Sequence, residues 1–112
     1  MAAYEEKTGG ELLAIAHNGN LGNGTMFPII ESFTRNLVDR EYVVTREKWE
    51  RLYEATQMKG DGETHPLLSP NDEFANFGDA GWELGNLTMQ RKKTPDMLAG
   101  DYVREALKRG LT

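Results

Sequence analysis

The chain has 112 residues, of which 13 are Lys or Arg and 18 are Asp or Glu, giving a net charge of −5. This length allows at most one domain, and the acidic balance disfavours binding to a phosphate backbone. No run approaches the roughly 20 apolar residues of a membrane helix. The sequence has no cysteine, which excludes disulfides and thiolate metal ligands. We therefore expect neither nucleic acid nor membrane as a partner, and the sequence does not indicate a cellular compartment.

The N-terminal residues predict a helix end, a turn and then a strand. Residues 5–7 are charged and close the helix, and Gly9-Gly10 supplies the turn. The apolar run 12–16 is typical of a buried strand, which delivers His17 into a loop rich in Gly and Asn. The apolar stretch 25–30 contains a proline and is expected to form a packed loop or an edge strand.

A helix and a second strand follow. Apolar positions over about 39–52 fall near one face, with Asp39 as the N-cap and Trp49 as a core anchor. Residues 53–59 then predict a strand. A strand, a helix and a strand in this order favour a βαβ unit, in which the two strands run parallel.

The second half of the chain is less regular. Ser69 is a candidate N-cap of a short helix, with a proline directly behind it. Residues 77–95 show no period and predict a long irregular connection, in which the basic run 91–93 is expected to be a solvated loop. Residues 101–109 predict an amphipathic helix that a glycine ends.

These elements predict an α/β fold with one βαβ unit and long loops. Because two strands rarely form a stable sheet by themselves, we expect residues 1–112 to be a single incomplete domain from which other strands are missing. The exposed strand edges and apolar surface of such a fragment favour self-association.

Polar side chains of metal-binding types follow both predicted strands. The carboxyl ends of parallel strands meet at one edge of a sheet, so these side chains are expected to face one cavity. Imidazole and carboxylate groups suit zinc, manganese or iron. The alternative is that His17 only hydrogen-bonds its loop and that 60–66 is an ordinary polar turn. The candidate residues are His17, Glu54, Asp61, Glu63 and His65.

The loop after His17 carries two Gly/Asn triplets, 18–20 and 22–24. They lack the Lys and Ser/Thr of a phosphate-binding P-loop and the spacing of a dinucleotide fingerprint. Gly and Asn both tolerate positive φ, so a tight turn is favoured over a phosphate cradle. Asn18, Asn20 and Asn23 remain candidates for contact with a substrate.

Three blocks of the chain, 14–27, 57–74 and 102–111, resemble the bacterial family called domain of unknown function 3604. The resemblance implies a protein of several hundred residues that is distantly similar to the polymerase-and-histidinol-phosphatase superfamily. Members of that superfamily fold as metal-binding (β/α) barrels and often hydrolyse phosphoesters. The resemblance therefore implies that this chain is a partial (β/α) barrel, an internal fragment of a larger protein.

The same resemblance implies roles for single residues. His17 closes an apolar strand as a metal ligand of the superfamily does, and either Glu54 or Glu63 matches a second ligand. A His-x-His strand near the N-terminus, which the superfamily would have, is not in the sequence, and the chain stops before the expected Asp-Ser-His segment. The chain is thus expected to carry at most half of a metal site.

The leading hypothesis is part of a divalent-metal-dependent hydrolase, in which metal-activated water attacks a small-molecule substrate such as a phosphoester. Lys59, Asp61 and His65 are the candidates for catalytic contact, Lys59 because a cation stabilises phosphoryl charge. Alone, the chain is expected to be inactive because its ligands are too few. The alternative is a non-catalytic binding or interaction module.

Overall fold

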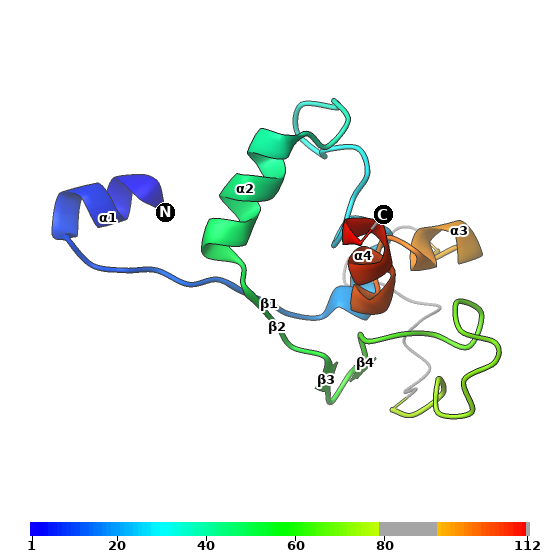
Figure 1. The fold of residues 1–112 in the computed structure, drawn as a ribbon. Helices are drawn as coiled ribbons and strands as arrows, with labels where there is room; N and C mark the ends of the chain where they lie inside the picture. The colour runs from blue at the N-terminus through cyan, green and yellow to red at the C-terminus, as the bar shows by residue number, and fades with distance from the viewer. Residues whose placement is uncertain (79–91, 112) are drawn as a thin grey trace.

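The computed structural model describes residues 1–78 and 92–111. The chain is mixed α/β, with short helices and two pairs of very short strands (Figure 1). Its elements in order are α1 (Ala2–Thr8), β1 (Ile15–Ala16), the 3-10 turn η1 (Gly19–Leu21), α2 (Arg40–Trp49), β2 (Leu52–Tyr53), β3 (Thr56–Gln57), β4 (Gly60–Asp61), α3 (Pro95–Leu98) and α4 (Val103–Gly110). In Figure 1, α1 lies at the end of an extended segment, and its Glu5 pairs with Lys48 of α2 at 3.6 Å.

The predicted βαβ unit is present. Strands β1 and β2 pair in parallel, with Ile15 opposite Leu52 and Ala16 opposite Tyr53, and α2 connects them. The Glu54 N–H donates to the Ala16 carbonyl at 3.0 Å, which carries the pairing one residue further. Within the described ranges the strands form only two separate pairs, so no barrel closes there.

The predicted strand over 53–59 is wrong in its extent. Strand β2 ends at Tyr53, and the chain then folds back as the hairpin β3–β4, with Gln57 opposite Gly60. The chain reverses at Met58 and Lys59, and Gly60, which directly follows this turn, has φ of 116°, a conformation that side-chain-bearing residues rarely adopt. The prediction of a single strand over 53–59 therefore missed a tight turn.

The predictions of a helix end near Gly9, a helix that begins after Asp39 and a C-terminal helix are confirmed, whereas α2 ends at Trp49 and so is shorter than the predicted 39–52. Asp39 caps α2 by accepting from the Tyr42 N–H at 2.8 Å, and Gly9 ends α1 with φ of 69°. Helix α4 covers most of the predicted 101–109 segment. Trp49, however, is only partly buried, and α2 contains no buried residue, so the expected core anchor is wrong.

The short helix predicted at Ser69 is replaced by consecutive turns over 66–78. The Ser69 hydroxyl bonds the Thr64 hydroxyl at 2.8 Å, and its own N–H donates to the His65 carbonyl at 3.0 Å. The serine is therefore held by the preceding residues and does not cap a helix. Of the predicted irregular connection 77–95, residues 79–91 lie outside the described residues, and α3 begins at its end.

The core lies where α3 and the start of α4 pack on the loop around η1. Its buried apolar residues are Leu21, Ala75, Met97, Leu98 and Tyr102. Among them lies an ion pair between Lys93 and Asp101, whose side chains are 1% and 0% exposed. The Lys93 ammonium also donates to the Asn20 carbonyl. The prediction of a solvated basic run is therefore wrong at Lys93, because a lysine can be buried when its charge is paired.

Asp101 ties the C-terminal elements to the Gly/Asn loop. Its Oδ1 accepts from the Gly24 N–H at 2.7 Å, and its other oxygen contacts the Lys93 ammonium. Burial raises the pKa of Asp101, while Lys93 and the N–H groups of Gly24 and Met26 act in the opposite direction. The loop thus encloses a carboxylate of its own chain.

Tyr53 joins the same region from β2. Its hydroxyl donates to the Gly62 carbonyl at 3.1 Å and lies against the Cα of both Gly19 and Gly62, so that a Cβ at either glycine would overlap it. Burial raises the pKa of the Tyr53 phenol, and nearby carboxylates, Asp61 first, act in the same direction. The phenol therefore stays protonated near neutral pH.

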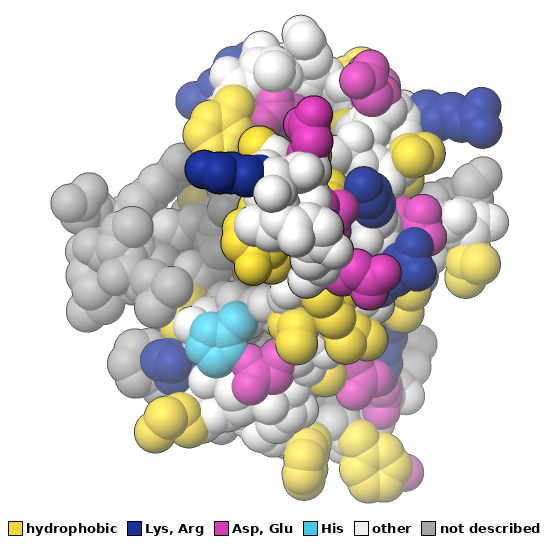
Figure 2. All heavy atoms as spheres, turned by 90° about the vertical axis from the view of Figure 1, so that its left-hand side faces the viewer, with side chains coloured by type: hydrophobic (Ala, Val, Ile, Leu, Met, Phe, Trp, Pro, Cys, Tyr) yellow, Lys and Arg dark blue, Asp and Glu magenta, His cyan; other side chains and the backbone are white. Residues whose placement is uncertain are grey.

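Large apolar side chains remain on the surface. Phe33, Met58 and Leu111 are 94%, 91% and 88% exposed. Figure 2 shows such side chains distributed over one face between charged groups. The expected self-association stays a prediction. None of the helices in the described parts of the chain has the length and apolar character needed to cross a membrane.

We predict that Lys93→Met lowers the free energy of unfolding by about 3–5 kcal/mol, because it leaves the Asp101 carboxylate buried without its counter-ion. Urea unfolding followed by circular dichroism measures this. Lys92→Met is the matched control, since Lys92 is exposed and its replacement should change the free energy by no more than about 0.5 kcal/mol. Equal effects of the two substitutions would contradict the role given to the buried pair.

We predict that Gly62→Ala is destabilising by about 1–3 kcal/mol and that Tyr53→Phe in the same chain reduces this cost, because the phenylalanine lacks the hydroxyl that the new methyl would meet. A double-mutant cycle on unfolding free energies measures the coupling. Gly110→Ala, where an added Cβ meets nothing within 4 Å, should be nearly neutral. Strict additivity of the Gly62 and Tyr53 substitutions would disprove the proposed contact.

Candidate functional site

His17 and Glu54 directly follow the two parallel strands. The register that pairs Ala16 with Tyr53 places these two residues opposite each other as the next pair. Because side chains alternate between the faces of a strand pair, both point to the side opposite Ala16 and Tyr53. The His17 Nδ1 contacts a carboxylate oxygen of Glu54. The structure thus brings together two predicted site residues that lie 37 positions apart.

The pair is accessible. The His17 side chain is 51% exposed and that of Glu54 is 39% exposed. A carboxylate that binds one ring nitrogen fixes the orientation of the imidazole and leaves the other nitrogen for a ligand or a proton. The chemistry of this donor set, one imidazole and one carboxylate, suits zinc, manganese or iron.

Two donors are fewer than the three protein ligands that hold a typical catalytic zinc ion. Across residues 1–78 and 92–111, no three side chains of the types His, Cys, Asp or Glu are grouped so that they would hold a metal. The pair therefore fits part of a metal site and does not complete one.

Glu63, the other glutamate with a predicted role, has a different partner. Its Oε1 binds the Arg104 guanidinium at 2.5 Å, and the same guanidinium binds Asp72 at 2.6 Å. These bonds join Glu63 to α4. Of the two alternatives left open by the sequence, Glu54 is the one that contacts His17.

The Arg104 guanidinium also changes the acidity of its partner. Its hydrogen bond lowers the pKa of Asp72, and the Phe74 N–H adds to this effect. A carboxyl group with a lowered pKa stabilises the fold at pH values above its ordinary pKa, and this contribution is lost as the pH falls. Arg104 thus fastens the segment 63–72 to α4 most firmly near neutral pH.

Asp61 and His65 have contacts that shape the loop between them. The Asp61 carboxylate accepts from the Thr56 hydroxyl and from the N–H groups of Glu63 and Thr64, at 3.1–3.2 Å. The ring of His65 lies 5.8 Å from that of Tyr102, and its Nδ1 accepts from the Leu67 N–H at 3.2 Å. Their predicted catalytic roles stay predictions.

The three predicted asparagines differ in their surroundings. Asn18 and Asn23 adopt left-handed φ values of 55° and 52°, which confirms the tight turn expected of this loop. Asn20 is buried, and its amide donates to the Lys59 carbonyl at 2.9 Å. The Asn18 Oδ1 accepts from the Lys59 ammonium at 3.2 Å. Two of the three asparagines therefore hold Lys59.

Sequence reasoning missed the groups that position this loop. Lys93 lies in a short basic run, and Asp101 resembles an ordinary charge near a helix start, so neither shows its burial. Tyr53 carried no signal beyond its place in a predicted strand. Glycines were the local sign of these close approaches, because Gly19 and Gly62 leave room for the Tyr53 hydroxyl and Gly22 leaves room for the Asp101 carboxylate.

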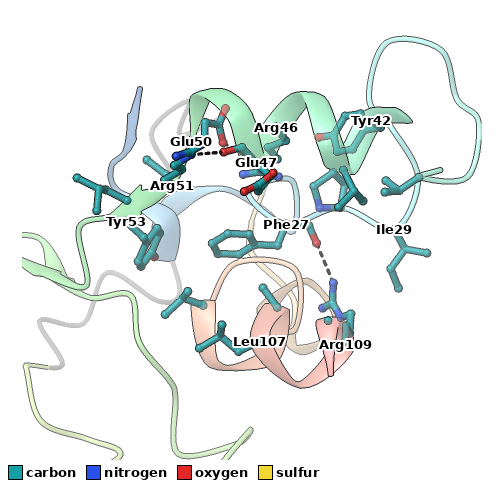
Figure 3. Close-up of a pocket in the computed structure, with 18 of the residues that line it drawn as sticks. Phe27, Ile29, Tyr42, Arg46, Glu47, Glu50, Arg51, Tyr53, Leu107 and Arg109 are labelled. Atoms are coloured by element: carbon teal, nitrogen blue, oxygen red, sulfur yellow. Dashed lines mark hydrogen bonds and ion pairs between the residues drawn. The ribbon is translucent and has the colours of Figure 1, made fainter. Parts of the chain in front are cut away.

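A separate apolar groove of about 880 Å³ lies between α2 and α4. Figure 3 shows Phe27 between these helices, with Arg46 on one side and Arg109 on the other. The Arg46 guanidinium lies 5.2 Å from the Phe27 ring centre, and Arg109 donates to the Phe27 carbonyl at 2.9 Å. No pattern in the sequence predicted this groove.

Taken together, these features define a mixed α/β chain with a histidine–glutamate pair at the carboxyl edge of a parallel strand pair. The model of the family described as "Protein of unknown function (DUF3604)" matches residues 1–112, and the chain belongs to that family. No curated protein and no solved structure matches the chain.

We predict that Arg104→Gln raises the pKa of Asp72 toward the ordinary value of about 3.9 and weakens the loss of stability on acidification. Carbon-13 NMR titration of the carboxyl groups and unfolding at several pH values measure both effects. Lys108→Gln is the control, because Lys108 pairs with Glu105 on the exposed part of α4. An unchanged Asp72 pKa in the Arg104 variant would refute the assignment.

Proposed function

We propose that the protein is a divalent-metal-dependent hydrolase and that His17 and Glu54 supply part of its metal site. The contact of these two side chains at the ends of adjacent parallel strands is the observation that carries the proposal. Their partial exposure supports it, because a ligand can reach them. An ion pair between exposed side chains contributes little to stability, so a structural role alone does not explain the position of His17 and Glu54.

In this proposal, the chain is part of a larger metal-binding (β/α) barrel of the polymerase-and-histidinol-phosphatase type. Its βαβ unit supports the assignment, since such barrels repeat parallel strands and crossover helices and place their catalytic residues at the carboxyl ends of the strands. His17 and Glu54 lie at such ends. The other metal ligands come from residues outside this pair.

Each residue of the pair has a defined task. A bound divalent ion would lower the pKa of a water molecule so that hydroxide forms near neutral pH. Glu54 holds the His17 imidazole in one orientation through Nδ1, which leaves Nε2 of His17 to hold the ion. The substrate is a small molecule, a phosphoester in the first instance.

Manganese binding tests the site in this chain directly. The chain has two histidines, His17 and His65. We predict that Mn²⁺ broadens the imidazole NMR signals of His17 at lower concentrations than those of His65, because the His17 Nδ1 contacts the carboxylate of Glu54, a predicted metal ligand. Glu54→Gln should weaken the effect, and Glu47→Gln, which removes an exposed carboxylate from α2, should not. Equal broadening of both histidines, or none, would overturn the metal site.

Activity tests the reaction itself. In the complete reading frame that encodes these residues, we expect chelator-sensitive hydrolysis of an aryl phosphate, with His17→Ala reducing both turnover and metal content by at least about 100-fold. The 112-residue chain alone should show no turnover. If the complete protein binds metal at His17 but hydrolyses no phosphoester, the metal site is kept and the phosphoesterase function is rejected.

The apolar groove between α2 and α4 favours a second candidate, a non-catalytic binding module. In that case the complete protein would lack hydrolytic activity with and without metal, and His17→Ala would not alter its binding behaviour. The activity measurement therefore separates the two candidates.

A further inference from the structure

Lys59 is held at three points beside the His17 loop. Its N–H donates to Gln57 Oε1 at 2.8 Å, its carbonyl accepts from the Asn20 amide at 2.9 Å, and its ammonium donates to Asn18 Oδ1 at 3.2 Å. All three partners are amide side chains. A flexible lysine is thereby fixed at the tip of the β3–β4 hairpin.

The charge of this lysine is not neutralised within the described residues. Lys48, Lys93 and Lys108 each lie within 4.0 Å of a carboxylate, whereas no such ion pair is formed by Lys59 in residues 1–78 and 92–111. Lys7 and Lys92 also lack a carboxylate there, but no side chain holds their ammonium groups. Lys59 alone in this group has a fixed position and an uncompensated charge.

The asparagine that holds the ammonium directly follows the proposed ligand His17 in the chain, so the positive charge lies near the backbone of His17. The loop itself is anchored from within, because the Asn20 carbonyl accepts from buried Lys93. An ammonium has three donors, of which Asn18 uses one, so the described part of the chain leaves two of them for an anion.

We propose that Lys59 binds a phosphoryl oxygen of the substrate and that the substrate is a phosphate monoester. The choice of substrate rests on the proposed hydrolase function, whereas the anion site rests on Lys59 and Asn18 alone. A divalent ion and an ammonium together favour a dianion over a neutral ester or a singly charged diester. The Asn18 amide keeps the ammonium in place before the substrate arrives, which lowers the cost of binding.

Inorganic phosphate, added to the chain without metal, is the probe. Titration at constant ionic strength should shift the side-chain amide signal of Asn18 and the backbone amide signal of Lys59 in a saturable manner. Lys59→Met should weaken the apparent affinity about tenfold, the loss expected for one charge-assisted hydrogen bond. Lys92→Met removes an exposed lysine outside the hairpin and should leave the affinity unchanged.

Each outcome decides the proposal. The anion site is overturned if phosphate causes no saturable shift, or if Lys59→Met binds phosphate as tightly as the wild type does. Equal shifts with acetate and phosphate overturn the phosphoryl assignment and leave a general anion site. Unchanged far-ultraviolet circular dichroism of Lys59→Met shows that the variant folds, and Lys59→Arg should recover part of the affinity because it keeps the charge.

His17→Ala separates this inference from the proposed function. Phosphate binding that survives in His17→Ala, together with no manganese effect at His17 in the wild type, would keep the anion site and reject the hydrolase. In the complete protein, Lys59→Met should raise KM for an aryl phosphate monoester while metal content stays unchanged. Loss of metal in that variant would instead place Lys59 in the support of the metal site.

Discussion

The buried ion pair between Lys93 and Asp101 is the interaction on which the rest of the described structure depends. The Asp101 carboxylate accepts from the Gly24 N–H, and the Lys93 ammonium donates to the Asn20 carbonyl, so two charges from the C-terminal part of the chain hold the Gly/Asn loop at two points. Burying either charge alone would be costly, and the fold therefore forms only when the distant segments meet. The loop after His17 takes its shape from residues more than 70 positions away.

The candidate site depends on this arrangement because its own strands are minimal. Strands β1 and β2 contain two residues each and cannot hold His17 and Glu54 rigidly by themselves. Tyr53, which directly precedes Glu54, is fixed against Gly62 and the loop. Lys59 is fixed through Asn18 and Asn20. The exposed polar groups are thus positioned by buried groups on the same short segments.

Local sequence patterns predicted those parts of the fold that local physics determines. The apolar run before His17 and the Asp39 cap indicated the βαβ unit, whose parallel strand ends place His17 near Glu54. The run is not the buried strand that was predicted, because β1 has only two residues and Ile15 is 56% exposed. Local patterns failed where a residue far along the chain determines the contacts or the burial of a side chain. Arg104, 41 positions along the chain, binds Glu63, and Asp101 makes the burial of Lys93 favourable. The hairpin before Gly60 was missed because its turn is formed by Met58 and Lys59, which are not among the residue types that usually mark turns.

The burial of Lys93 also gives this fold a built-in chemical reporter. An amine that is 1% exposed cannot meet an acylating reagent in the folded chain, whereas Lys92, next to it, is in contact with solvent. Modification of Lys93 must wait until the segment around Asn20 and Asp101 separates, so its rate is set by how often the chain opens there. The two neighbouring lysines have equal intrinsic reactivity, so Lys92 serves as the reference for Lys93. The ratio of their acylation rates measures how often the loop that carries the candidate site opens.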